Sequence, residues 1–347
     1  MSIARSSPAQ ERAHLLRLAA IAIAIFGAMS FLRPDLFFTA ANFQSMAFQF
    51  PEYAILALAM MLAMLTGGID LSVIGIANLS GILAAFTMAA LVPDAPGYGL
   101  DVLGAIGLAV AVSLTVGAVC GAINGLAIAA VGIPAILATL GTGLMFTGLA
   151  IVLTEGRAVL GFPDAFAVIG NGLVGPIPMP VLIFAALAVI LALVLNRTKF
   201  GLRVYLMGTN PLAARFAGID NWWITVRTYV GCGVLSACAG LVLMSRANSA
   251  KADYGASYLL LAVLIAVLGG TNPYGGFGRV GGIVLAVLSL QFLSSGFNML
   301  QFSNFAKELV WGLTLLLVMG LTQVSLSRSA RRPTATKASG PASGSGG

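Results

Sequence analysis

The residues of this chain that could do chemistry are few and mostly uncharged. Only 8% of its 347 residues are charged, and the single histidine, His14, stands beside the basic N-terminus. Catalysis by a nucleophile with a base, or a histidine metal site, therefore lacks the residues it needs. Cys120, Cys232 and Cys238 lie in apolar stretches without a C-x-x-C pair, which argues against a disulfide framework and a zinc site. We expect a protein that is not an enzyme and holds no cofactor or metal.

Asp70 is the acidic residue nearest to the middle of an apolar region. A carboxylate at the centre of a membrane helix costs about 2.5–3.5 kcal/mol, so such a residue usually has a role. Gly67-Gly68 precedes Asp70 and Leu71-Ser72 follows it, which is also typical of a helix cap at a cytoplasmic turn. We favour the cap over an ion or proton site. A proton-coupled carrier would need a second buried ionisable group, and no good one is evident.

Amides, hydroxyls and glycines are more plentiful within the apolar stretches. Amides and hydroxyls exchange hydrogen bonds with a polyhydroxyl solute without demanding a charge, although many simply bond between helices. Our candidates for a translocation pathway are Gly67, Gly68, Asp70, Asn78, Asn124, Thr139, Thr142, Gly269, Gly270, Gln291 and Asn298.

The elements that must position these residues are membrane helices. Hydrophobic residues make up 59% of the chain and its mean hydropathy is +1.00, whereas a soluble globular protein is about 25% charged. A span needs about 20 apolar residues. Ten candidates meet or approach this length: 14–33, 52–67, 72–92, 102–130, 134–153, 179–196, 223–246, 257–270, 280–297 and 305–323. The second and the eighth are short, and both run into glycine pairs.

The distribution of Lys and Arg predicts the orientation of the spans. With ten crossings and a cytoplasmic N-terminus, the basic loop 197–222 and the C-terminal tail lie inside, together with most of the 18 basic residues. Eight crossings remain open if the two short segments are re-entrant. We therefore predict an all-α integral membrane protein with both termini cytoplasmic. Its parts are a cytoplasmic segment 1–13, a transmembrane domain 14–323, and a disordered cytoplasmic tail 324–347.

The two halves of the transmembrane domain resemble each other weakly. Residues 56–86 and 260–288 both run from an apolar stretch through a glycine pair and a polar turn to a second apolar stretch. Matched interruptions of this kind often mark the binding site of a transporter. The alternative is that Gly and Pro are simply frequent in membrane helices.

The loop 197–222 is the longest polar stretch inside the domain. Asn210-Pro211 is a pair that starts helices well, and Gly218 can end a short one. We expect a short surface helix presented to a cytoplasmic partner, with an ordinary connecting loop as the alternative. None of the four lysines follows a glycine, so the chain has no phosphate-binding P-loop. If transport is driven by ATP, another subunit must hydrolyse it.

Five stretches together resemble a known family. They are TGGIDLS at 66–72, GAING at 121–125, IPAILATLGT at 133–142, TKFGLR at 198–203 and GTNPLAARFAGI at 208–219. In this order and spacing they are similar to the membrane permease subunits of ribose/xylose/galactose-type bacterial ABC importers, over about residues 15–323. Branched-chain amino acid permeases share the broader family. Sugar permeases often have an arginine where this chain has Thr147 before Gly148, which leaves the substrate open.

The resemblance implies a multi-pass protein of the bacterial inner membrane that forms the pathway for a pentose or hexose. Its partners would be a cytoplasmic ABC ATPase subunit, an extracytoplasmic sugar-binding protein, a second or sister permease in a dimer, and membrane lipid. Nucleic acid is not expected. Alternatives are a permease for branched-chain amino acids or another small polar solute, or a secondary carrier. The residues implied in contact with the ATPase are Asn210, Pro211, Leu212, Ala214, Arg215, Phe216 and Gly218.

Overall fold

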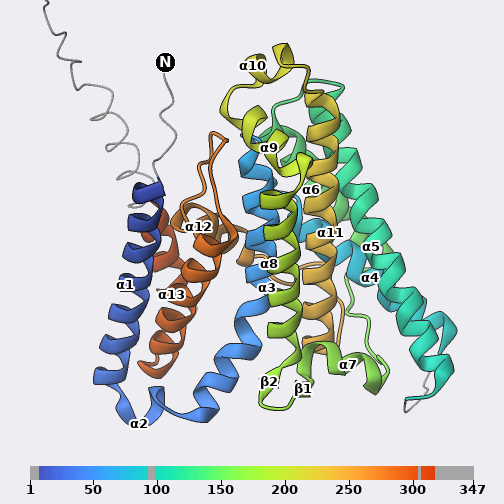
Figure 1. Cartoon of the computed structure of the whole chain (residues 1–347). Coiled ribbons are helices and arrows are strands. Elements are labelled where there is room, and N and C mark those ends of the chain that lie inside the picture. Colours follow the sequence, from blue (N-terminus) through green and yellow to red (C-terminus); the bar gives the residue numbers. More distant parts are fainter. Residues whose placement is uncertain (1–7, 93–97, 304–305, 317–347) are drawn as a thin grey trace, which may run out of the picture.

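A computed structural model describes residues 8–92, 98–303 and 306–316 and shows a bundle of long helices (Figure 1). Eight helices in these ranges are long and apolar enough to cross a membrane. They are α1 (Pro8–Leu32), α3 (Ala40–Leu65), α4 (Val73–Leu91), α5 (Leu100–Ala129), α6 (Ala135–Thr154), α8 (Met179–Arg197), α11 (Asn221–Ala247) and α13 (Val280–Met299). The prediction of an all-α membrane protein is confirmed.

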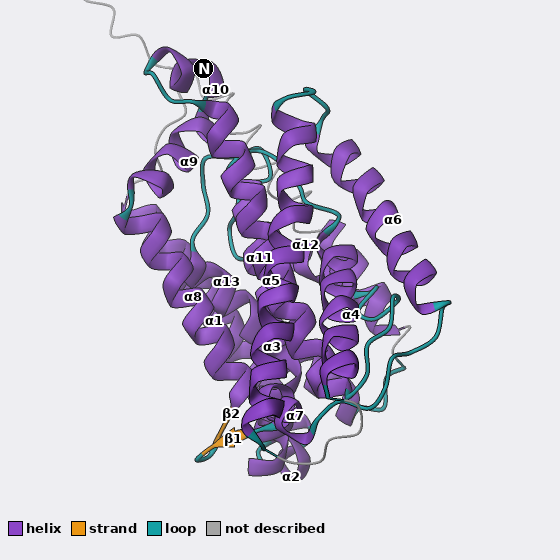
Figure 2. Ribbon diagram, turned by 90° about the vertical axis from the view of Figure 1, so that its right-hand side faces the viewer, coloured by secondary structure: helices purple, strands orange, loops and turns teal. Residues whose placement is uncertain are grey.

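Short elements gather at the two ends of the bundle. The helices α9 (Lys199–Thr209) and α10 (Pro211–Phe216) lie at one end, which we call the α10 end (Figures 1 and 2). At the opposite end, the α7 end, lie α2 (Pro34–Phe37), α7 (Asp164–Asn171) and the hairpin of β1 (Leu173–Val174) with β2 (Ile177–Pro178). The apolar length of the bundle separates these two ends.

The second predicted segment is not short, which corrects the expectation from its apolar run. It belongs to α3, which begins at Ala40, where the Thr39 side chain accepts a hydrogen bond from the Asn42 N–H (3.2 Å). The first half of this helix was not predicted because it contains polar residues and Pro51. The eighth segment, α12 (Tyr258–Leu268), does have only 11 residues. Such a helix is about 16 Å long, half the thickness of a bilayer core. The tenth segment, 305–323, is helical over 306–316 and otherwise lies outside the described residues.

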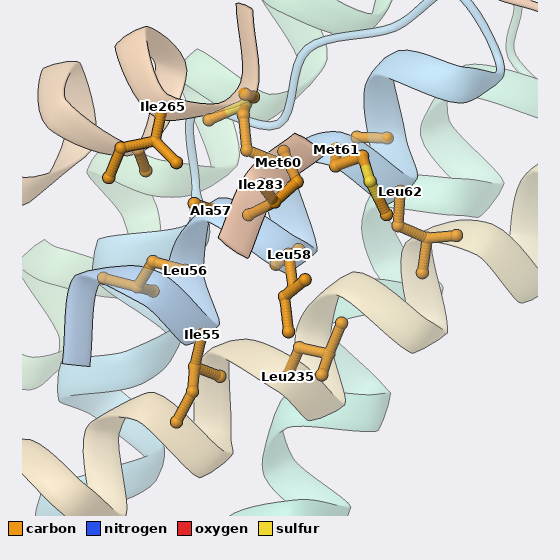
Figure 3. Packing of buried hydrophobic residues seen from close by; sticks show 14 of the residues in the cluster. Ile55, Leu56, Ala57, Leu58, Met60, Met61, Leu62, Leu235, Ile265 and Ile283 are labelled. Carbon is orange, nitrogen blue, oxygen red and sulfur yellow. The ribbon is translucent and has the colours of Figure 1, made fainter. Parts of the chain in front are cut away.

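Helix α3 is the centre of the bundle. In its most apolar stretch 89% of the residues are buried, against 11% for α1 at the periphery. Figure 3 shows Leu58 of α3 close to Leu235 of α11, with Ile265 of α12 and Ile283 of α13 around the same helix. The outer helices α1, α5, α6 and α8 leave large apolar side chains exposed. This distribution is typical of a protein whose outer surface faces lipid or another membrane subunit.

Glycines bring α5 and α11 into backbone contact. A Cβ atom on Gly121 would lie 2.2 Å from the Tyr229 carbonyl oxygen, and one on Gly117 would lie 2.5 Å from that of Gly233. Gly125 is equally close to α11 one turn further on. Small residues spaced four apart let membrane helices approach closely, as the sequence predicted for its many glycines.

This contact predicts an unequal response to the same substitution on one helix. Gly121→Leu should force α5 away from α11 and lower the thermal denaturation midpoint of the purified protein, because overpacking costs about 1–3 kcal/mol. Gly104→Leu is the matched control, since nothing lies within 4 Å of a Cβ at Gly104. Equal midpoints for the two variants, measured by size-exclusion chromatography after heating, would contradict this account of the α5–α11 contact.

Candidate functional site

The chain between α3 and α4 turns back into the bundle. Residues 66–72 form this segment, which we call the buried turn; Asp70 and Ser72 within it have no exposed surface. The buried turn lies against α11, because a Cβ on Gly68 would be 2.3 Å from the Tyr229 hydroxyl. Tyr229 lies roughly 12 Å along α11 from its first residue. Asp70 is therefore deep in the bundle, which corrects its expected place at a cytoplasmic turn.

Asp70 bonds to the residue just before α4 and does not itself cap that helix, whose N-cap is Ser72 and has no side-chain capping bond. Its Oδ1 atom accepts hydrogen bonds from the Ser72 N–H (3.0 Å) and from the Ser72 hydroxyl (2.6 Å). The carboxylate thereby satisfies backbone that the preceding turn leaves outside a helix.

Three more candidate residues join Asp70 in one network. The Asn124 amide of α5 donates to Ser72 Oγ (2.7 Å), and the Thr142 hydroxyl of α6 donates to Asn124 Oδ1 (2.5 Å). Thr139 Oγ1 accepts from the Leu71 N–H (3.0 Å) and lies within hydrogen-bond distance of the Ile69 carbonyl (3.0 Å). Irregular backbone at membrane depth persists only where protein or water satisfies it. The side chains of Asp70 and Thr139 provide hydrogen bonds to the backbone of this turn.

Two polar atoms beside this network have no partner in the part of the chain described. They are Asp70 Oδ2 and the Tyr229 hydroxyl, and both are buried. Gly68 leaves the space that the hydroxyl occupies, since a Cβ there would lie 2.3 Å from it. One hydrogen-bond acceptor in the buried turn and one donor beside it are therefore unpaired.

The two glycine-interrupted segments of the sequence lie against each other. The Gly276 N–H donates to the Leu65 carbonyl (2.9 Å), and Gly67, at φ +82°, would place a Cβ 3.2 Å from the Tyr274 oxygen. The second segment also brings α12 onto α13, because a Cβ on Gly269 would lie 2.9 Å from the carbonyl carbon of Gly282. The two halves of the domain therefore resemble each other at two loops that contact each other in the structure.

Three candidates lie outside this site. The Asn78 amide donates to the carbonyls of Ala252 (2.8 Å) and Tyr254 (2.9 Å), so it holds the turns before α12. Gln291 of α13 accepts a hydrogen bond from the Tyr53 hydroxyl. Asn298, near the end of α13, accepts one from Lys307.

The sequence reasoning missed a second buried acidic residue. Glu52 of α3 is only 1% exposed and forms an ion pair with Arg246 of α11. It was overlooked because it stood at the presumed edge of its apolar segment, directly after Pro51. A glutamate inside a 26-residue helix is the signal that could have found it.

The expected surface helix is present as α10. The Asn210 side chain accepts from the Ala213 N–H (3.0 Å) at its start, and Gly218 follows its end at φ +76°. Leu212 and Phe216 are 63% and 84% exposed on this short helix. Ala214 is buried against its own chain, so it anchors α10 and is not on the exposed surface.

Helix α9 joins α10 to the glycine loops. A Cβ on Gly208 would lie 1.9 Å from the Leu65 oxygen and 2.5 Å from the Gly276 nitrogen. The Tyr205 hydroxyl donates to the Gly278 carbonyl (2.8 Å). The end of α3, the end of α9 and the loop after α12 therefore share one tight junction, and a displacement of α9 would press on the segment leading into the buried turn.

Comparison with known proteins gives this arrangement a context. Residues 42–319 match the family model described as branched-chain amino acid transport system / permease component. The chain is similar to the ribose import permease protein RbsC of Haemophilus influenzae, with 34% identity over 86% of this chain and 89% of the relative. For RbsC of Bacillus subtilis the values are 36%, 84% and 87%. For the autoinducer 2 import system permease protein LsrD of Klebsiella pneumoniae they are 34%, 92% and 93%. No solved structure matched.

The unpaired oxygen of Asp70 predicts an effect of Asp70→Asn. Asp70 Oδ2 is buried without a partner among the described residues, and an unpaired buried charge is costly. Asn keeps the Oδ1 acceptor that Ser72 uses and removes the charge, so the variant should denature at a higher temperature than wild type at pH 7.5.

The matched control is Asp253→Asn, which changes an exposed carboxylate paired with Lys251. It should show no such gain at pH 7.5. An Asp70→Asn variant no more stable than wild type would show that the charge of Asp70 does not destabilise the fold.

Proposed function

This chain belongs to the permease-component family of branched-chain amino acid transport systems, and we propose that it forms the membrane pathway of an ABC importer for a pentose or hexose. It is a multi-pass permease of the bacterial inner membrane and a transport component rather than an enzyme. The observation that carries the sugar assignment is the similarity to ribose import permeases over more than four fifths of both chains.

A second candidate solute has a specific observation in its favour. The similarity to an autoinducer 2 import permease is as high as that to the ribose permeases and extends over 330 residues. The amides and hydroxyls within the spans suit any small polyhydroxyl solute. A branched-chain amino acid would instead need a partner for its charged groups, and Asp70 and Glu52 both lie in contacts within the chain. A secondary carrier is disfavoured because it would need ionisable groups linked to one another. Asp70 bonds to Ser72 and Glu52 pairs with Arg246, so the two acids are not linked.

The proposed assembly contains more than this chain. As a permease of an ABC importer it works with an ATPase and a solute-binding protein. We further propose that two permeases, identical or sister chains, form a dimer in the lipid bilayer. Part of the apolar surface of α1, α5, α6 and α8 would then face the second permease instead of lipid.

We assign the α10 end to the cytoplasm. Lys199, Arg203 and Arg215 lie there, as positive-inside bias requires. With this orientation, segment 1–13 and tail 324–347 are cytoplasmic and the transmembrane domain covers 14–323 in ten crossings. The eighth crossing combines the non-helical stretch 248–257 with α12, because α12 alone is too short.

The contact with the ATPase is placed on α10. Phe216 and Leu212 are large, apolar and exposed on a helix of only six residues, and four residues apart they share one face. Arg215 adds a charge that an acidic residue of the ATPase could pair with. Asn210, Pro211, Gly218 and the buried Ala214 shape and anchor the helix. Movement of α10 would reach the buried turn and its pathway candidates through the α9 junction.

The proposed function predicts ATP-dependent uptake. The chain, reconstituted in liposomes with its ATPase and binding protein, should accumulate radiolabelled D-ribose or another pentose or hexose only when ATP is supplied on the α10 side. Omitting the ATPase subunit is the control. Uptake of autoinducer 2 without uptake of any sugar would move the assignment to the second candidate, and uptake of leucine alone would refute both.

The coupling role predicts a selective defect. Phe216→Asp places a charge on the exposed face of α10 without disturbing internal packing, so the protein should fold and insert normally. Binding of the ATPase, measured by co-purification, should fall at least tenfold, because removing a central aromatic contact costs about 2 kcal/mol or more. Leu160→Asp, at an exposed leucine beyond α6, should leave that binding unchanged. Equal co-purification of both variants would exclude α10 as the coupling element.

A further inference from the structure

A second polar cluster lies inside the bundle, well apart from the buried turn. It consists of Glu52, Tyr53, Arg246, Tyr258 and Gln291, contributed by α3, α11, α12 and α13, and we call it the Tyr53 cluster. Arg246 and Tyr229 are both in α11, 17 residues apart, which corresponds to about 26 Å along the helix. The Tyr53 cluster is thus nearer the α7 end.

The members of the Tyr53 cluster are joined in a chain of contacts. Arg246 binds the Glu52 carboxylate through two nitrogens, one of them at 3.3 Å from Oε2. The Tyr258 hydroxyl bonds to the same carboxylate. The rings of Tyr258 and Tyr53 meet edge to face at 5.7 Å, and the Tyr53 hydroxyl donates to Gln291 Oε1.

One donor in the Tyr53 cluster has nothing to bind. Gln291 is 2% exposed, and its Nε2 atom is buried without a hydrogen-bond partner among the described residues. A primary amide nitrogen carries two donors, and leaving a buried donor unsatisfied costs about 1–3 kcal/mol. The Tyr53 hydroxyl accounts for the amide oxygen of Gln291, but no contact among the described residues accounts for its Nε2 donor.

The ion pair in the Tyr53 cluster is also poorly explained by stability. Replacing a buried ion pair with apolar residues is often neutral or stabilising, and ionisable residues within membrane spans usually face a pathway. Among the described residues Glu52–Arg246 is the only ion pair with a buried member. Arg246 keeps 30% of its side chain exposed at the end of α11, so the cluster is within reach of the α7 end.

The chemistry of the Tyr53 cluster matches a monosaccharide. A sugar presents hydroxyls, each both donor and acceptor, on a ring with apolar C–H faces. The cluster offers a carboxylate that accepts, a guanidinium and an amide that donate, and two tyrosines with apolar faces and polar tips. Pathway sites commonly combine aromatic walls with a few convergent polar groups. Sugar hydroxyls would take up the free Gln291 donor and exchange with the contacts now made within the cluster.

We propose that the Tyr53 cluster is a hydroxyl-binding subsite on the translocation pathway, which holds the sugar between the α7 end and the buried turn. This inference rests on the proposed function as a sugar permease. Tyr53 and Gln291 are specificity-determining residues in it, because their polar ends face each other and the Gln291 Nε2 donor is unpaired. The bond between them closes the subsite when no sugar is present.

The test uses the full transporter in liposomes, with D-ribose and its 2-deoxy and 5-deoxy analogues as probes. Gln291→Leu and Tyr53→Phe each remove a hydrogen-bonding group and keep the size of the side chain. Each should lower ribose uptake roughly three- to ten-fold, the effect of one lost hydrogen bond, and reduce discrimination against at least one deoxy analogue by a similar factor. A merely structural role would lower uptake of all three sugars equally.

Ser289→Ala is the matched control. Ser289 is buried on the same helix, and its hydroxyl bonds to the Leu285 carbonyl of α13 itself (2.8 Å), so this variant should transport like wild type. Unchanged ratios of ribose to both analogues in Gln291→Leu and Tyr53→Phe, with wild-type ribose uptake intact, would overturn the subsite alone. A wild-type complex that imports no pentose or hexose would overturn the proposed function and the subsite together.

Discussion

The structure depends on the rule that backbone inside a membrane must find hydrogen bonds within the protein. The buried turn breaks the helical ladder between α3 and α4 at depth, and its freed backbone groups bond to the side chains of Asp70 and Thr139. Asn124 and Thr142 then hold Ser72 in place from α5 and α6. One irregular segment thus explains why polar residues are present on two neighbouring helices. Those residues have a structural role whether or not they contact a solute.

The structure also depends on close contact between the backbones of neighbouring helices. The glycines of α5 admit α11, and Gly208 and Gly276 admit the end of α3 at the junction with α9. Apolar burial alone drives little association between helices in lipid, so packing of small residues and polar bonds must supply it. The same junction connects a surface helix to the buried turn by direct contact, which is what a coupling element needs if ATP-driven changes outside the membrane are to alter a pathway inside it.

The buried turn and the Tyr53 cluster are two polar sites at different depths in the bundle. The buried turn keeps Asp70 Oδ2 and the Tyr229 hydroxyl unpaired, and the Tyr53 cluster keeps Gln291 Nε2 unpaired. Buried polar atoms in folded proteins are nearly always satisfied, so exceptions call for an explanation. A pathway for a polyhydroxyl solute provides one, because each passing hydroxyl offers a partner that the protein itself does not contain.

Composition alone determined that the chain is a helical membrane protein, since so few charges cannot cover a water-facing surface. Local patterns also located the short helix after Asn210 and the two glycine interruptions, because helix starts, turns and glycines act over a few residues. Tertiary structure decided what these features meet. Asp70 lies deep in the bundle because the chain dips inward, and Glu52 is tolerated within α3 because Arg246, 194 residues away, reaches it. Partners so distant in sequence leave no local pattern, so only the folded bundle could bring them together.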